Sequence, residues 1–264
     1  MSDPLLYVAA GLFVGVMVGL TGVGGGSLMT PILVLLFGQS PAVAVGTDLM
    51  FSATTKLAAT ASFGYTRRID WRIVGRLAIG SLPGAACVLL WFWLMRGRSQ
   101  AESHVIPHCL AVMLALTAVG LLLQNILHRL GIRVTANWLE RAERYKFSLT
   151  VITGLLLGVG VTLTSVGAGA LGAAALLCLY PLRLTADRLI ATDIAHALPV
   201  TIVAAIGHAS LGHINLPVLA CLLLGSVPGV LFASRLVIRI PQTLTRMMIA
   251  LVLALISERI LLHP

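Results

Sequence analysis

The sequence predicts an all-α integral membrane protein, built as an inverted-topology repeat with five helical segments in each half. Three observations predict this fold class. The chain has 264 residues, of which 58% are hydrophobic and only 10% are charged, whereas soluble domains are normally about 25% charged. Apolar stretches recur along its whole length. A glycine-rich break inside an apolar stretch, at residues 20–28, has a counterpart at residues 163–171.

The composition also narrows the function class. The net charge of +9 does not indicate nucleic-acid binding, because the basic residues lie in short loops rather than in one patch. The four cysteines each stand alone in an apolar stretch, so we interpret them as small buried hydrophobes. The N-terminus lacks the basic region of a signal peptide, so we expect the first apolar segment to be retained.

We predict ten apolar helical segments, at about residues 5–20, 26–37, 41–64, 73–95, 105–127, 147–163, 169–180, 185–209, 216–234 and 245–262. Most of them can cross a hydrocarbon core of about 30 Å at about 1.5 Å per residue. The second and seventh segments directly follow a glycine break and are too short to do so. We expect these half-helices to return in re-entrant hairpins, with tilted or broken crossings as the alternative.

The distribution of Lys and Arg predicts the orientation. Loops that follow odd-numbered segments, together with the segment ends that adjoin them, contain thirteen of these residues, at positions 67, 68, 72, 129, 133, 141, 144, 146, 183, 188, 235, 239 and 246. Even-numbered loops and the C-terminus contain three, Arg96, Arg98 and Arg259. Because basic loops stay in the cytoplasm, we expect a multi-pass membrane protein with both termini on the extracytoplasmic side.

The two halves match beyond the glycine breaks. Thr47-Asp48 corresponds to Thr192-Asp193, and the Gly-Ser-Leu-Pro-Gly motif at 80–84 corresponds to Gly-Ser-Val-Pro-Gly at 225–229. Because each half has an odd number of segments, the halves face opposite ways. We therefore divide the chain into a first transmembrane repeat, 1–127, a basic cytoplasmic linker, 128–146, and a second, inverted repeat, 147–264.

The glycine breaks predict an anion site near the membrane midplane. The N-terminus of a half-helix offers unpaired N–H groups and a partial positive charge, and glycine lets a ligand approach them. Close helix packing is the structural alternative. Of the two breaks, the glycine-richer first one, with Gly24, Gly25 and Gly26, is expected to matter more. Our predicted substrate-binding residues are Thr21, Gly22, Gly24, Gly25, Gly26, Ser27, Thr47, Thr164, Ser165, Gly167, Gly169 and Thr192.

Four ionisable residues inside apolar segments form a predicted coupling or polar network. Asp48 and Asp193 each follow a threonine early in a long segment, and carboxylates in hydrocarbon are usually functional. They would carry protons, bind a co-transported cation or cap broken backbone. Lys56 would neutralise Asp48 or attract the substrate, while His196, three residues after Asp193, would relay protons.

The motifs of catalysis are missing from the sequence. The break at 22–27 lacks the lysine of a P-loop and follows an apolar helix rather than a strand. The sequence has neither a Gly-x-Ser-x-Gly elbow nor a His or Cys cluster with metal-ligand spacing. We therefore expect a protein that is not an enzyme and needs no cofactor or metal.

Several of these motifs together resemble the TauE/SafE-type sulfite exporter family of membrane permeases. They are the glycine run at 22–26 followed by Pro31, the Ala-Val-Gly-Thr-Asp-Leu motif at 44–49, the Ile-Asp-Trp-Arg motif at 69–72, and the motif at 80–84. The second glycine break departs from this pattern at Ala168. The resemblance implies a bacterial or archaeal inner-membrane protein that moves small sulfur-containing or carboxylate anions, often outward.

Residues and resemblance together predict a secondary transporter, acting as an exporter, of sulfite, a sulfonate or another sulfur-containing oxyanion. The substrate would bind between the two half-helix N-termini. The lipid bilayer is a further partner, and protons would be one if transport is coupled to them. Two alternatives remain open. One is a passive anion channel, and the other is a non-catalytic membrane subunit of a sulfur-metabolism complex. The sequence leaves the oligomeric state open.

Overall fold

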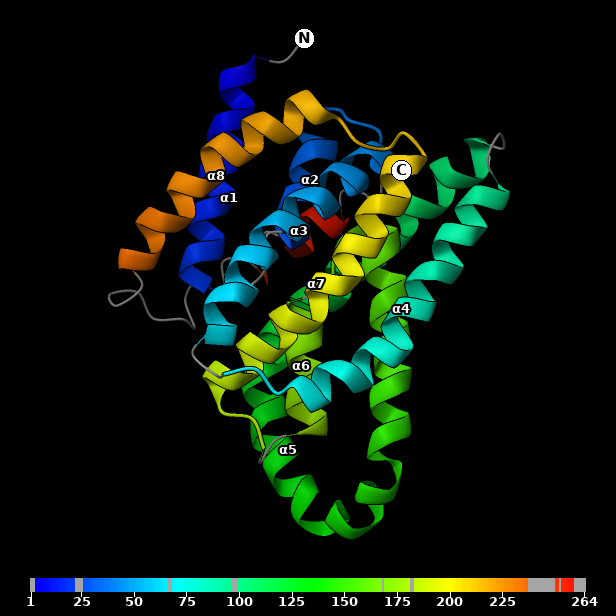
Figure 1. The fold of residues 1–264 in the computed structure, drawn as a ribbon, viewed down its shortest axis with the longest axis vertical. Helices are drawn as coiled ribbons and strands as arrows, with labels where there is room; N and C mark the ends of the chain where they lie inside the picture. Colours follow the sequence, from blue (N-terminus) through cyan, green and yellow to red (C-terminus); the bar gives the residue numbers. More distant parts are fainter. Residues whose placement is uncertain are drawn as a thin grey trace.

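The protein is described by a computed structural model that covers residues 3–21, 26–65, 68–95, 99–167, 169–180, 183–236, 250–251 and 253–258. All regular structure in this part of the chain is helical (Figure 1), which confirms the predicted fold class. The main helices are α1 (Pro4–Thr21), α2 (Gly26–Leu35), α3 (Pro41–Tyr65), α4 (Trp71–Leu94), α5 (Ser99–Thr164), α6 (Ala170–Leu179), α7 (Ala186–Ser210) and α8 (Leu216–Leu236).

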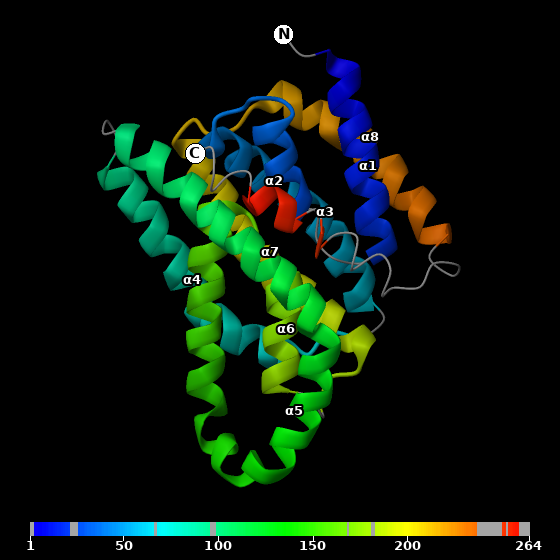
Figure 2. The same cartoon turned by 180° about the vertical axis from the view of Figure 1, so that it is seen from behind.

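The bounds of α1 to α8 follow the predicted segments closely, with one difference in the middle of the chain, while more than half of the tenth predicted segment, 245–262, lies outside the described residues. Predicted segments 105–127 and 147–163 both belong to α5, whose backbone is helical across the predicted linker 128–146 as well. Figure 2 shows α5 doubling back at the bottom of the molecule, so its two arms run in opposite directions. The linker contains few helix breakers, with Gly131 its only glycine, which is consistent with a helical connection.

Several helices are long and apolar enough to cross a membrane. Within the described residues four qualify by length and composition: Trp71–Leu94, Ile106–Leu123, Tyr145–Thr164 and Arg188–Ser210. Apolar side chains on these spans face outward, including Leu90, Leu116, Leu156 and Ile206. An apolar exterior is what lipid requires, so the chain is an integral membrane protein.

The two short helices lie in opposite halves of the molecule. Both α2 and α6 have ten residues, which is too short to span a bilayer core at about 1.5 Å per residue. Figure 2 shows α2 in the upper half and α6 in the lower half. The arm of α5 that precedes α6 runs upward, and α6 returns downward (Figure 1). This course is consistent with the hairpin that was predicted for α6.

Two pairs of helices pack closely across the halves in the same way. α1 packs against α8, and the second arm of α5 packs against α4. A side chain at Gly11 would collide with the carbonyl of Leu222, and one at Gly154 would collide with the carbonyl of Leu77. Gly11 and Gly154 are 143 residues apart, and Leu77 and Leu222 are 145 apart. This recurrence supports the predicted repeat, and small residues at such crossings are typical of membrane helices.

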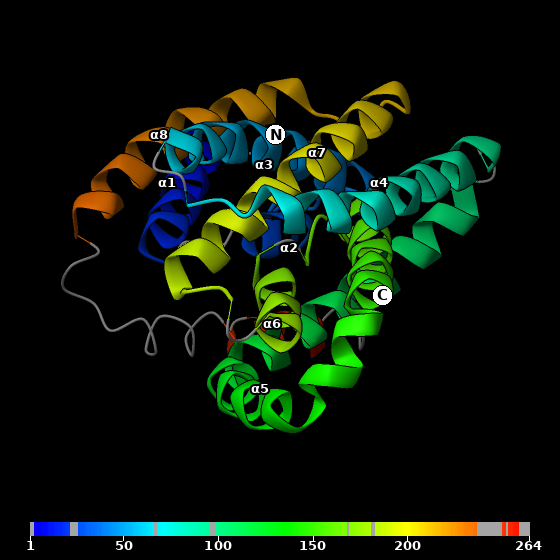
Figure 3. The ribbon, with the colours of Figure 1, turned by 60° about the horizontal axis from the view of Figure 1, so that its bottom comes forward.

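α3 and α7 form the centre of the molecule. They pack against each other, and Figure 3 shows them crossing beside α2. Their buried side chains, including Val45, Leu49 and Val200, join an apolar cluster with Phe92 of α4 and Val161 of α5. Asp48 is the eighth residue of α3 and Asp193 is the eighth residue of α7. The two predicted acids therefore enter the core at matching positions.

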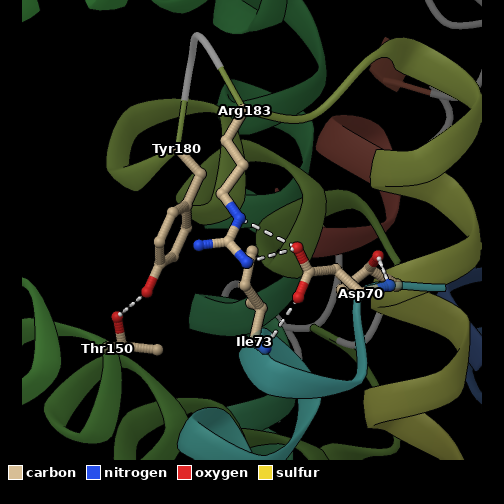
Figure 4. A network of polar contacts seen from close by, with 6 residues as sticks. Asp70, Ile73, Thr150, Tyr180 and Arg183 are labelled. Atoms are coloured by element: carbon tan, nitrogen blue, oxygen red, sulfur yellow. Dashed lines mark hydrogen bonds and ion pairs between the residues drawn. The ribbon is translucent and has the colours of Figure 1, made fainter.

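A network of polar contacts anchors the far end of α6 (Figure 4). The Arg183 guanidinium, just after α6, donates to Asp70 Oδ2 from Nε at 2.9 Å and from a terminal nitrogen at 2.8 Å. Asp70 also caps α4, because its side chain accepts a hydrogen bond from Ile73 N. The Tyr180 hydroxyl lies 2.7 Å from that of Thr150 on α5. α6 is thereby tied to α4 and α5 at its C-terminal end.

Candidate functional site

The second glycine break is a sharp interruption between α5 and α6. Ser165 has φ 58°, Gly167 has φ 113° and Gly169 has φ 129°. These left-handed conformations are costly for a residue with a side chain, which explains the glycines at two of the three positions. Ser165 adopts its conformation with a side chain, and it is buried. Strain held by a non-glycine residue inside the core is typical of functional sites.

Local hydrogen bonds satisfy the backbone that the break leaves unpaired. Thr164 Oγ1 donates to Gly160 O at 2.7 Å and accepts from Val166 N at 3.1 Å. His208 of α7, fully buried, bonds the carbonyl of Thr162 through Nε2 at 3.0 Å. Because a carbonyl only accepts, Nε2 of His208 carries the hydrogen. The Thr164 hydroxyl, which we predicted to bind substrate, is thus hydrogen-bonded to the backbone. The hydrogen bond of His208 was not predicted from the sequence.

α6 begins directly after this break. Its first internal bonds run from Gly172 N to Gly167 O and from Ala173 N to Gly169 O, each at 3.0 Å. The N–H groups before them are in the positions that have no partner within a helix, and Gly169, the N-cap residue, makes no side-chain cap hydrogen bond in the described structure. The other half-helix, α2, begins at Gly26. Gly22, Gly24 and Gly25, and the side chains of Thr21 and Ser27, lie outside the described residues.

Asp48 is fully buried and held by hydroxyl groups. Thr30 of α2 donates from Oγ1 to Asp48 Oδ2 at 2.5 Å, and Ser52 donates to Oδ1 at 3.5 Å. The hydroxyl of Ser165, at the other break, lies close to this carboxylate without making a hydrogen bond to it. Asp48 therefore lies between the half-helix α2, which it contacts through Thr30, and the break before α6. Thr30 was missed by the sequence reasoning, although a hydroxyl inside a half-helix that follows a glycine break could have signalled it.

Asp48, Lys56 and Asp193 form what we call the interior charge cluster. Their exposed fractions are 0%, 4% and 3%, and Lys56 interacts electrostatically with both carboxylates. Lys56 Nζ, Asp193 Oδ1 and the Ser165 hydroxyl have no hydrogen-bonding partner among the described residues. Buried polar groups are normally paired. Unpaired polar atoms on three elements beside a helix start suggest a position for a polar ligand.

The remaining predicted residues have partners within the protein. His196 Nε2 lies 2.9 Å from the hydroxyl of Ser81 on α4. Thr47 Oγ1 accepts from Asn215 N at 3.0 Å, and Thr192 Oγ1 accepts from Asp70 N at 3.1 Å. The structure therefore brings Asp48, Lys56, Asp193 and Ser165 together, and gives Thr47, Thr192 and His196 contacts to neighbouring helices.

Gly172 allows one of these acids to reach α6. A Cβ atom at position 172 would collide with Asp193 Oδ1, so the carboxylate of Asp193 lies directly against the first turn of α6. The sequence reasoning did not single out Gly172. Its signal was weak, because a glycine in an alanine-rich half-helix is also compatible with simple close packing.

Comparison with known proteins finds similarity to membrane transport proteins. The family model described as "Sulfite exporter TauE/SafE" matches residues 7–259. A relative from Bacillus subtilis (strain 168), "Probable membrane transporter protein YjnA", is 39% identical over 248 residues, which cover 93% of this chain and 95% of the relative.

A more distant relative from the same organism, "Probable membrane transporter protein YunE", is 29% identical over 122 residues, covering 45% of this chain and 41% of that protein. No solved structure matches the chain. The family match extends over nearly the whole sequence, as the resemblance in the motifs led us to expect. The chain belongs to the sulfite exporter TauE/SafE family of membrane transporters.

Proposed function

We propose that this protein is a secondary transporter of a small sulfur-containing oxyanion, such as sulfite or a sulfonate, and that it acts without catalysis. The single observation that supports this most is the ammonium of Lys56 in the protein interior, which has no hydrogen-bonding partner among the described residues. A buried cation is costly without a counter-charge. Its two neighbouring acids supply that charge in the empty protein, and an oxyanion would supply it in the loaded one.

The substrate would bind between the two glycine breaks. The N–H groups of the first turn of α6 and the hydroxyl of Ser165, which has no partner among the described residues, are donors that suit the oxygens of a sulfite or sulfonate group. The corresponding donors of α2 would come from residues 22–27. Gly167 and Gly169 would add no side chains to this position. Thr47, Thr164 and Thr192 would act indirectly, by holding the helices that carry the site.

The cross-half packing suits alternating access. Each of the two glycine-mediated helix pairs, α1 with α8 and α4 with α5, joins a helix of one predicted repeat to a helix of the other. Rocking of the pairs about α3 and α7 would open the site to one side at a time. Such a cycle is saturable and supports counterflow, whereas a passive anion channel shows neither. Outward transport is suggested by the family description, and the gradients present would decide the direction.

Transport in proteoliposomes tests this proposal. The purified full chain should mediate saturable exchange of labelled sulfite or an alkanesulfonate. Unlabelled anion inside the vesicles should accelerate the entry of the labelled anion. Gly25→Leu should abolish exchange by filling the first break. Gly75→Leu is the matched control, since no described atom outside its own helical turn lies within 4 Å of a Cβ at Gly75. Unchanged exchange in Gly25→Leu would rule out the site at the breaks, and exchange without saturation or counterflow would indicate a channel.

A further inference from the structure

The two carboxylates of the interior charge cluster have unequal surroundings. Asp48 accepts hydrogen bonds from Thr30 and Ser52, and such bonds favour an ionised carboxylate. Asp193 Oδ1 has no hydrogen-bonding partner among the residues that the structure describes. In a medium of low dielectric constant, a carboxylate without donors is the one that most readily takes up a proton. Of the two acids, Asp193 is therefore the better proton acceptor.

Asp193 also occupies the positive surroundings that an anionic substrate needs. Its Oδ1 lies against Gly172 in the first turn of α6, where the helix start carries about half a positive charge. Lys56 attracts the same carboxylate. An ionised Asp193 and a bound oxyanion would compete for these charges and repel each other strongly at this depth. Binding of the anion therefore requires that the charge of Asp193 be removed.

The other titratable groups near Asp193 cannot take over this role easily. On the neighbouring elements, segments 26–35, 150–164 and 170–177 contain no ionisable side chain. His196, one turn further along α7, is bonded to Ser81. Asp70, at the start of α4, is paired with Arg183. On α4 itself, Arg76 lies over the ring of Phe147, 6.0 Å from its centroid, and Arg72 is exposed. On α3 the charged groups are Asp48 and Lys56.

We propose that the transported anion crosses together with one proton, the anion paired with the ammonium of Lys56 and the proton bound to the carboxylate of Asp193. This inference rests on the proposed transport of an anion. The proton enters from water on the side of anion entry and returns to water on the side of release, and no covalent bond to the anion forms. Loaded and empty sites then carry the same total charge. Export follows when the outward anion gradient exceeds the inward proton gradient.

Proton movement by the wild-type protein gives the first test. Proteoliposomes would be loaded with a pH indicator and supplied with an alkanesulfonate, which stays a monoanion near neutral pH, while potassium and valinomycin clamp the voltage. We expect one proton to enter with each labelled sulfonate and no dependence of the flux on voltage. Sulfonate entry without proton entry, or a flux that follows the voltage, would overturn the proposal. This measurement needs no variant.

Substitutions then test the two proposed roles, proton binding by Asp193 and anion pairing by Lys56. Asp193→Asn resembles the protonated acid, so we expect it to exchange sulfonate at close to the wild-type rate but to lose accumulation driven by a pH gradient. Lys56→Gln should lower both exchange and accumulation by about tenfold or more, the loss expected for a buried charge-assisted contact. Thermal unfolding would establish that each variant is folded. Accumulation driven by a pH gradient in Asp193→Asn would overturn the assignment.

Matched controls remove charges outside the cluster. Glu258→Gln removes an exposed carboxylate, and Arg76→Gln removes the cation that lies over Phe147. Both should retain exchange and accumulation. If the wild-type protein exchanges no sulfur oxyanion or carboxylate, the proposed function itself fails. If it exchanges them without moving protons, only this further inference fails.

Discussion

The hydroxyl of Thr47 on α3 accepts a 3.0 Å hydrogen bond from the backbone N–H of Asn215, which precedes α8 in the other half of the chain. The reverse contact also exists, since Thr192 of α7 accepts a 3.1 Å bond from Asp70 N before α4. Thr47 and Thr192, like Asp70 and Asn215, are 145 residues apart. Each half therefore holds the start of a helix that belongs to the other.

These contacts predict that the two threonines stabilise the fold more than they bind substrate. Thr47→Val and Thr192→Val keep the side-chain shape but leave an N–H group without an acceptor. Each should lower the free energy of unfolding by about 1 kcal/mol, measured by unfolding in mixed detergent micelles. Thr54→Val is the control, because that exposed hydroxyl bonds only to its own helix. A loss of substrate affinity with unchanged stability would instead favour a binding role.

The glycine contacts between helices predict a steric cost at one position and none at another. Gly154→Ala places a methyl group against the carbonyl of Leu77, and overpacking of this kind costs about 1–3 kcal/mol. At Gly75 on α4, an added Cβ meets no described atom outside its own helical turn within 4 Å, so Gly75→Ala should leave the stability unchanged or slightly raised. Equal melting temperatures for the two variants in detergent would contradict the close packing of α4 and α5.

The sequence predicted the helices better than their contacts. Periods of apolar residues and glycine breaks are local signals, so the bounds of α3 and α7 were predicted to within one residue. The two half-helices were predicted from the short length of their apolar segments. The linker residues carried charge, which indicated a loop, although their backbone is helical. Charge decides where a segment lies relative to lipid but does not prevent a helix.

The site could be predicted in its residue types but not in its pairing. Asp48, Lys56 and Asp193 were identified because ionisable groups are rare in apolar segments. Thr47 and Thr192 appeared to be free donors, yet their partners lie 168 and 122 residues away. Thr30 and Gly172 gain their roles only through tertiary packing against Asp48 and Asp193. No local pattern specifies such distant partners.

The short contact between Thr30 and Asp48 predicts a strong effect of losing one hydroxyl. Thr30→Val removes the donor to a fully buried carboxylate. We expect a loss of about 1–3 kcal/mol and slower sulfite exchange, because α2 is no longer fixed to α3. Thr30→Ser retains the hydroxyl and should recover most of both. Equal behaviour of the valine and serine variants would show that the hydrogen bond contributes little.

The ion pair between Asp70 and Arg183 predicts a small, salt-dependent contribution. Asn215 stands at the position that matches Asp70 and also caps its helix, accepting from Val218 N. Asp70→Asn should therefore keep the cap of α4 and lose only the ion pair. Because the Arg183 side chain is 42% exposed, the cost should stay below about 1 kcal/mol and fall at high salt. A larger, salt-independent loss would indicate that the cap had failed.

The positive φ of Ser165 separates what its backbone does from what its hydroxyl does. At φ 58° an L-residue is strained by about 1–2 kcal/mol, which glycine avoids. The hydroxyl has no hydrogen-bonding partner in the described part of the chain, so Ser165→Gly loses no bond and should stabilise the protein by up to about 1 kcal/mol. Ser165→Val, β-branched in a left-handed conformation, should destabilise it. If the hydroxyl binds the anion, sulfite exchange falls in the glycine variant while its melting temperature rises. A glycine variant with full exchange would remove Ser165 from the site and leave the strain as a purely structural feature of the break.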